Sequence, residues 1–158
     1  MASIRPAVPA DLDSIVELIG ALADYEHLRH EVVLDSAVLA DHLFGPRPYA
    51  EVLIAEADGA AVGFALFFHN FSTFLGRPGI HLEDLFVRPE RRGAGHGRAL
   101  LRELGRLALA RDCGRVEWSV LDWNEPSIAF YRSLGAVPME EWTVYRVTGD
   151  TMVALADA

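Results

Sequence analysis

The amino-acid sequence predicts an α/β fold in which a mixed, mostly antiparallel sheet of about seven strands carries helices on both faces. The 158 residues suit one compact domain, with no internal repeat and no linker. Hydrophobic residues make up 51% of the chain, which is enough for a substantial core. Segments with the apolar spacing of strands and of helices follow one another along the chain, and this order is typical of a mixed sheet covered by helices.

The first part of the chain predicts one short strand and two helices. Residues 3–8 form an extended start. Residues 11–25 carry apolar side chains at helical spacing, so a helix is expected there. Residues 35–43 predict a second, shorter helix, which Gly45 and Pro46 end.

The middle of the chain changes to the pattern of strands. Residues 50–57 and 61–69 are apolar runs joined by Asp58-Gly59, a dipeptide typical of hairpin turns. The tract 70–79, NFSTFLGRPG, predicts a loop because of its polar, glycine and proline content. Residues 80–87 predict another strand.

The last part of the chain predicts two helices and three strands. The first helix is expected at 98–111, where leucines form one apolar face. The second is expected between Asn124, a favourable N-cap, and Gly135, a favourable terminator. Strands are expected at 116–121, 136–139 and 142–147, and the tail 151–158 adds a further strand or frays.

The segment RRGAGHGR, residues 91–98, precedes the helix expected at 98–111. A glycine-rich turn that opens a helix is typical of an anion site, although a plain turn is the alternative. A dinucleotide site is disfavoured because Arg98 stands where the third glycine of that fingerprint belongs. All 14 basic residues are arginines, which excludes a P-loop nucleotidase and a Schiff-base enzyme, since both need lysine.

Two segments carry a resemblance to a known family. LEDLFVRPERRGAGHGRALL, residues 82–101, resembles motif A of the GNAT superfamily of N-acetyltransferases, and WNEPSIAFYRSLGA, residues 123–136, resembles motif B. The stretches IRPA, LADYE and HLEDLFV are similar to the diamine acetyltransferase branch, which includes spermidine/spermine and thialysine acetyltransferases. The resemblance implies the GNAT fold and direct transfer of acetyl from acetyl-CoA to a primary amine of a small molecule, in a ternary complex.

The resemblance also implies which residues hold acetyl-CoA as co-substrate. The backbone at Leu85, Phe86 and Val87 would pair with the pantetheine arm, and an N–H there would polarise the thioester carbonyl. His96 is an expected cofactor contact within the loop, although its side chain is free to face solvent, and Asn124 can serve both as helix cap and as cofactor contact. The remaining expected contacts are Arg92, Gly93, Ala94, Gly95, Gly97, Arg98, Ser127 and Tyr131.

Acetyl transfer requires the ammonium of the acceptor, with a pKa of about 10.4, to lose a proton. Glu83 matches the family base, which acts through water, and the alternative is that Glu83 only binds substrate. Asp84 is expected to contact substrate or to be a structural acid, and strand alternation predicts that Glu83 and Asp84 point to opposite faces. Tyr131 matches the general acid that protonates the leaving thiolate, with a core aromatic as the alternative.

Substrate binding is expected to involve Glu26, in LADYE, and Trp142, which also fits a core aromatic. Where polyamine enzymes place an aspartate, this chain has Ser72-Thr73, and fewer acids suit a shorter amine or one with its own carboxylate. Arg77 could pair with that carboxylate, although a solvated loop arginine is the alternative.

The net charge of −9 argues against nucleic-acid partners and is compatible with a cationic substrate. The single cysteine and the absence of a long apolar run or signal peptide predict a cytoplasmic protein with no membrane partner. No metal is expected, because His27 and His30 lack further ligands nearby in the sequence. The resemblance implies a homodimer. The alternative functions are a GNAT-fold acyl-CoA-binding sensor or partner module and a protein-lysine acetyltransferase.

Overall fold

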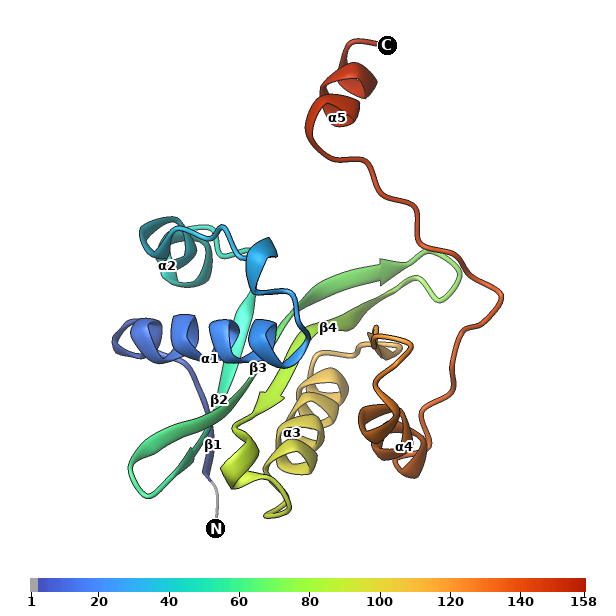
Figure 1. The fold of residues 1–158 in the computed structure, drawn as a ribbon. Coiled ribbons are helices and arrows are strands. Elements are labelled where there is room, and N and C mark those ends of the chain that lie inside the picture. The colour runs from blue at the N-terminus through green and yellow to red at the C-terminus, as the bar shows by residue number, and fades with distance from the viewer. Residues whose placement is uncertain (1–2) are drawn as a thin grey trace. The chain divides into compact units, whose positions relative to one another are not determined.

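The computed structural model describes residues 3–158 and divides the chain into two compact units. The first unit ends at Ser119 and holds the sheet, and the second spans Val120–Ala158. Figure 1 shows the course of the chain through the elements of each unit.

The sheet of the first unit has five strands, which lie side by side in chain order. The first four pair antiparallel, while the last pairs parallel to its neighbour, so the sheet is mixed and mostly antiparallel as predicted. The predicted number of about seven strands is too high by two. The strands are β1 (Ser3–Pro6), β2 (Glu51–Ala57), β3 (Ala60–Ser72), β4 (Arg77–Val87) and β5 (Val116–Trp118).

Helices cover both faces of this sheet, as the sequence predicted. α1 (Leu12–Tyr25) and α2 (Ser36–Phe44) lie on one face and α3 (His96–Ala110) on the other (Figure 1). Each face has its own apolar core, because alternate residues of β2 point to opposite sides. Short 3-10 turns occur at Pro9–Asp11, Arg29–Glu31 and Pro89–Arg91.

The hairpin of β3 and β4 is longer than predicted. The tract 70–79, expected to be a loop, is mostly strand, with Asn70 paired to Gly79 and only residues 73–76 left for the turn. The Ser72 hydroxyl accepts a hydrogen bond of 3.2 Å from the backbone N–H of Leu75, which closes the turn. Turn-forming residue types therefore sit inside a paired ladder, whose hydrogen bonds outweigh their weak strand propensity.

A β-bulge interrupts β4 at Glu83. Leu66 of β3 pairs with Asp84 and the next residue, Phe67, pairs with Leu82, so Glu83 has no partner of its own in β3. Leu82 and Leu85 pack in the same core against α3 although they are three residues apart. The regular alternation behind the prediction of opposite faces for Glu83 and Asp84 therefore breaks at this position.

The second unit contains α4 (Glu125–Ser133) and α5 (Gly149–Ala156). The strands predicted at 136–139 and 142–147 do not form, and most of the tail 151–158 is helical rather than extended. A strand needs a neighbour for its N–H and C=O groups, and the ladders of the described chain join only β1 to β5. Alternating apolar residues alone could not supply that neighbour.

Candidate active site

Three of the predicted substrate residues form an acidic cluster in the first unit. Glu26 lies at the C-terminal end of α1, and Glu83 and Asp84 lie at the bulge of β4. Burial and the negative charges of Glu83 and Glu26 raise the pKa of Asp84 to about 6, and burial alone raises the pKa of Glu26. Burial and mutual repulsion make the charged forms of these carboxylates unfavourable. Such carboxylates are more typical of a binding or catalytic site than of a structural core.

A histidine that the sequence reasoning missed lies beside this cluster. The Nε2 atom of His81 is 3.6 Å from Oε2 of Glu83, at side-chain exposures of 28% and 57%. The imidazole packs against the ring of Phe68, with centroids 4.9 Å apart. The signal in the sequence was the spacing of His81 and Glu83, two residues apart on one strand, which places neighbouring side chains on one face.

The glycine loop opens directly into α3. Gly93 and Gly95 have φ values of +81° and +84°, a region that favours glycine. A Cβ atom added at either position would meet no atom within 4 Å, so neither glycine is required by packing within the protein. Gly95 is the N-cap of α3 and makes no side-chain cap, which leaves backbone N–H groups of the first turn available to an anion.

His96 in this loop is buried, which corrects the expectation that it faces solvent. Its exposed fraction is 6%, and its Nδ1 has no hydrogen-bond partner among the described residues. A buried polar atom without a partner is rare in folded proteins. The helix N-terminus and this nitrogen together fit an anionic ligand at the loop.

Arg92 links the glycine loop to β4 and to the end of α1, the two elements that carry the acidic cluster. Its Nε donates a 2.9 Å hydrogen bond to the carbonyl oxygen of Val87, at the end of β4. Its guanidinium lies 4.6 Å from the ring centroid of Tyr25, next to Glu26, and 5.4 Å from that of Phe86. Tyr25 and Phe86 therefore position a predicted anion-binding residue. The Tyr25 contact joins two distant segments, so local sequence gave no signal for it.

The end of β4 has an open edge. β5 pairs only with Ile80–Leu82, so in the described chain Leu85, Phe86 and Val87 lie beyond that ladder. Their side chains pack toward the two cores, Leu85 and Val87 on the α3 face and Phe86 on the α1 face. The groups of these residues that remain for a ligand are therefore the backbone N–H and C=O groups, which can pair with an extended ligand.

The predicted residues of the second unit begin with Asn124, the N-cap of α4, and continue through that helix to Trp142. Asn124 is buried, and its side-chain oxygen accepts a 3.4 Å hydrogen bond from the Ser127 N–H, so the predicted helix cap is confirmed. Tyr131 is half-buried, with its ring 5.6 Å from that of Phe130. Trp142 is 77% exposed in an irregular segment, which is not the buried core position considered as its alternative.

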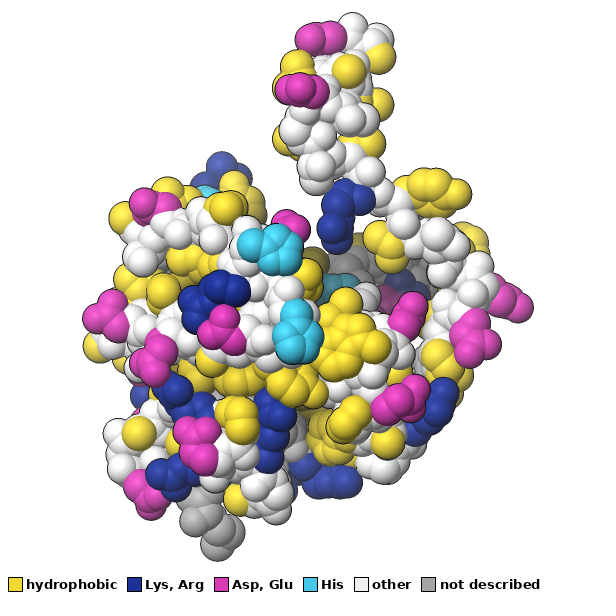
Figure 2. Space-filling model, in the orientation of Figure 1, with side chains coloured by type: hydrophobic (Ala, Val, Ile, Leu, Met, Phe, Trp, Pro, Cys, Tyr) yellow, Lys and Arg dark blue, Asp and Glu magenta, His cyan; other side chains and the backbone are white. Residues whose placement is uncertain are grey.

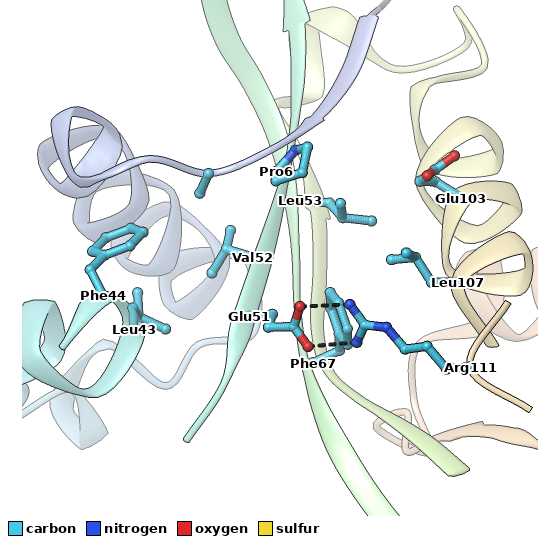
Figure 3. Close-up of a pocket in the computed structure, with 11 residues that line it drawn as sticks. Pro6, Leu43, Phe44, Glu51, Val52, Leu53, Phe67, Glu103, Leu107 and Arg111 are labelled. Carbon is cyan, nitrogen blue, oxygen red and sulfur yellow. Dashed lines mark hydrogen bonds and ion pairs between the residues drawn. The ribbon is translucent and has the colours of Figure 1, made fainter. Parts of the chain in front are cut away.

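A pocket elsewhere in the first unit contains none of the predicted site residues (Figure 3). Arg111 makes two contacts of 2.7 and 2.8 Å with the carboxylate of Glu51, and Glu103 pairs with Arg106. The charges on its wall are thus already compensated, and it offers no unpaired group to a ligand. Its remaining lining is mostly apolar, from Leu43, Phe44, Val52, Leu53, Phe67 and Leu107.

The remaining expectations concern Arg77, metal ions and membrane spans. Arg77 forms an ion pair of 3.2 Å with Asp112, both well exposed, as the alternative of a solvated arginine implies. Within residues 3–158, no three His, Cys, Asp or Glu side chains are grouped so as to hold a metal ion. No helix in the same range combines the length and hydropathy needed to cross a membrane.

Comparison with known proteins shows which family the chain resembles as a whole. The chain is 35% identical over 164 residues to thialysine N-epsilon-acetyltransferase of Bos taurus, covering 97% of this chain and 96% of the relative. It is 32% identical over 197 residues to L-ornithine N5-acetyltransferase NATA1 of Arabidopsis thaliana, covering 96% and 86%. Among solved structures, an integron cassette protein from the mobile metagenome of V. cholerae matches with a TM-score of 0.82, 26% identity and coverage of 99% and 98%. The model of the acetyltransferase (GNAT) family matches residues 13–136, and the chain belongs to this family.

Proposed function

We propose that the protein transfers the acetyl group of acetyl-CoA directly to a primary amine of a small molecule, within a ternary complex. The acidic cluster of Glu26, Glu83 and Asp84 carries this proposal, because it lies on the elements that Arg92 ties to the glycine loop. A cationic amine would relieve the repulsion among the three carboxylates. The full-length relatives are named for thialysine and ornithine, which supports an amino acid with a side-chain amine as the acceptor.

The residues of the loop fit the phosphates of acetyl-CoA. The N–H groups at 93–98 and Nδ1 of the buried His96 can donate to phosphate oxygens, with Arg92 and Arg98 supplying positive charge. The open edge at Leu85, Phe86 and Val87 would hold the extended arm. When bound, acetyl-CoA supplies the acetyl thioester, and an N–H of this edge can donate to its carbonyl oxygen.

Gly95→Ala is expected to raise the KM for acetyl-CoA about tenfold, because a methyl group at the N-cap would displace one charge-assisted hydrogen bond to phosphate. The left-handed backbone also costs about 1–2 kcal/mol of stability for alanine. Gly59→Ala is the matched control, since Gly59 has φ +74° and equally open surroundings in the β2–β3 turn. Both variants should lose similar stability in urea unfolding. An equal KM in the two variants would contradict the phosphate role of the loop.

On the acceptor side, Asp84 and Glu26 would hold the ammonium while Glu83 takes its proton or only binds it, as the sequence left open. The cluster's position supports substrate contact for all three carboxylates. Tyr131 would donate its phenol proton to the departing thiolate, with Ala94, Gly97, Asn124 and Ser127 completing the cofactor contacts and Trp142 the acceptor site. The resemblance of WNEPSIAFY to motif B supports the roles of Asn124, Ser127 and Tyr131.

The function is tested by incubating the pure protein with acetyl-CoA and a panel of thialysine, ornithine, diamines and polyamines, and by following free thiol. Turnover with one of these amines is the expected result. Bound acetyl-CoA without turnover would favour a sensor or partner module, and acetylation restricted to a lysine peptide panel would favour a protein acetyltransferase. The full-length relatives named for small amines disfavour both alternatives.

We also propose that the protein works as a cytoplasmic homodimer, as the resemblance implies. The exposed apolar residues of the second unit support association, since the largest are more than half exposed (α5 in Figure 2). Light scattering during size-exclusion chromatography should give twice the chain mass of 17.4 kDa. A single peak of monomer mass at micromolar concentration would contradict the dimer. The residues are Val137, Met139, Trp142, Val144, Tyr145, Met152, Val153 and Leu155.

A further inference from the structure

From the position of His81 beside Glu83, we infer that His81 accepts the substrate's proton from Glu83 and passes it to solvent. His81 is then the proton-relay residue of the acceptor site. This inference rests on the proposed function, because it needs an ammonium beside Glu83. Three observations carry it. His81 pairs with Glu83, Phe68 packs against the imidazole ring, and the other carboxylate near His81, that of Glu117, is already bound by Arg115 and Asn70.

The geometry directs the imidazole toward Glu83. Nε2 of His81 lies 3.6 Å from Oε2 of Glu83, slightly beyond a hydrogen bond. Glu83 belongs to the bulge and its side chain is more than half exposed, so a small rotation can close that gap when substrate binds. Catalytic hydrogen bonds are often long in the free enzyme and shorten in the complex.

The neighbouring strands hold His81 in place and leave Glu83 as its acidic partner. Phe68, the cross-strand partner of His81 on β3, stacks on the ring at 4.9 Å. On β5, the position opposite His81 is Glu117. Glu117 already accepts from Arg115 at 2.9 Å and from the side-chain amide of Asn70 at 3.1 Å. The charged groups around the relay are therefore Glu83, the compensated Glu117 with Arg115, and beyond Glu83 the carboxylates Asp84 and Glu26.

A histidine in this position makes removal of the substrate's proton less unfavourable than a carboxylate alone would. Passing a proton from an alkyl ammonium to an ordinary glutamate is unfavourable by about six powers of ten, and to an ordinary imidazole by about four. The relay proceeds with one bond formed for each bond broken. The ammonium N–H breaks as a Glu83 O–H forms, and that O–H breaks as Nε2–H forms on the neutral ring. The imidazolium, which is 28% exposed, then releases a proton to water.

The variant His81→Gln tests the relay in the full-length enzyme, with kcat and KM measured from pH 6 to pH 10. We expect kcat to fall about tenfold near neutral pH, with both KM values unchanged, because removing a proton-transfer group lowers only the chemical step. The loss should shrink at high pH, where hydroxide can take the proton, and added imidazole should restore part of the rate. His42→Gln is the control, since His42 packs against Tyr49 from α2 and faces no carboxylate of the cluster.

A double variant separates this role from a structural one. In the Glu83→Gln background, His81→Gln should have no further effect on kcat, because the proton no longer reaches the relay. Equal kcat in His81→Gln and wild type, a change confined to KM, or a full loss in the Glu83→Gln background would each overturn the inference. Thermal unfolding of each variant checks that the fold is intact. If wild type acetylates no amine, the proposed function fails instead, and the two failures are thus distinguishable.

Discussion

Asp84→Asn is expected to raise the free energy of unfolding by up to about 3 kcal/mol near neutral pH while it weakens the binding of the amine. Burial and the charges of Glu83 and Glu26 raise the pKa of Asp84 from 3.8 to about 6. The folded protein therefore favours the neutral carboxyl. At neutral pH Asp84 is nevertheless ionised, and this charge lowers the free energy of unfolding. The amide of asparagine has nearly the same shape and carries no charge, so the cost disappears.

The pH dependence follows from the direction of this shift. Below about pH 4, Asp84 is protonated in both the folded and the unfolded chain, and the full stability is present. As the pH rises through 6, the folded carboxyl ionises and that part of the stability is lost. The difference between Asp84→Asn and wild type should therefore be largest above pH 7 and should shrink steadily toward pH 4.

Urea unfolding at several pH values measures the stability difference, and steady-state kinetics with the best amine measures the functional loss. The KM for the amine should rise about tenfold, because one charge-assisted contact is removed. Asp13→Asn is the control, since Asp13 is exposed on α1 and its removal should change stability by less than about 0.5 kcal/mol at any pH. A destabilised Asp84→Asn protein, or one with unchanged KM, would show that Asp84 is a structural acid.

The gain in stability and the loss in function have the same cause. Three carboxylates around one position repel each other in the free protein, and a cationic substrate would relieve that repulsion. The arginine of this region does not fulfil that role from within, because Arg92 is bonded to the Val87 carbonyl and lies against Tyr25 and Phe86. This arrangement supports the proposed role of the cluster in binding a cationic ligand.

The sequence predicted the elements that depend on local signals. The helices at 12–25, 36–44 and 96–110 were expected at 11–25, 35–43 and 98–111 from apolar periodicity and end residues. The bulge at Glu83 has no local signal, because it depends on the register between β3 and β4. The burial of His96 likewise depends on what surrounds the loop, and its position between glycines gave no indication of it.

The site residues divide in the same way. Glycine-loop and motif residues are recognisable because their chemistry requires particular residue types at fixed spacing. His81 was missed because its spacing from Glu83 is a weak signal, and its contacts with Phe68 and Glu117 depend on the pairing of β4 with the two neighbouring strands. Residues 142–147 were predicted as a strand, but strand formation requires a paired neighbour, which sequence pattern cannot guarantee.

Tyr131→Phe is expected to lower kcat about 100-fold, because the thiolate of coenzyme A would leave without a proton donor. A phenol has a pKa of about 10 and a thiol one of about 8.5, so full proton transfer to a free thiolate is unfavourable by about 1.5 powers of ten, and the phenol assists by donating to the negative charge that develops on the departing sulfur. Phenylalanine keeps the ring that lies 5.6 Å from Phe130, and so the packing of α4 is preserved. Only the proton donor is lost.

The affinity for acetyl-CoA, measured by titration calorimetry, should stay within about twofold in Tyr131→Phe, because an acid that acts on the leaving group contributes little to the ground state. Tyr49→Phe is the control: the same atom is removed from a tyrosine that is 74% exposed and belongs neither to the site nor to the proposed dimer surface, and kcat should not change. A Tyr131→Phe enzyme with wild-type kcat would assign Tyr131 to packing. A loss in acetyl-CoA affinity equal to the loss in kcat/KM would assign it to cofactor binding, and only the expected split between the two constants identifies the proton donor.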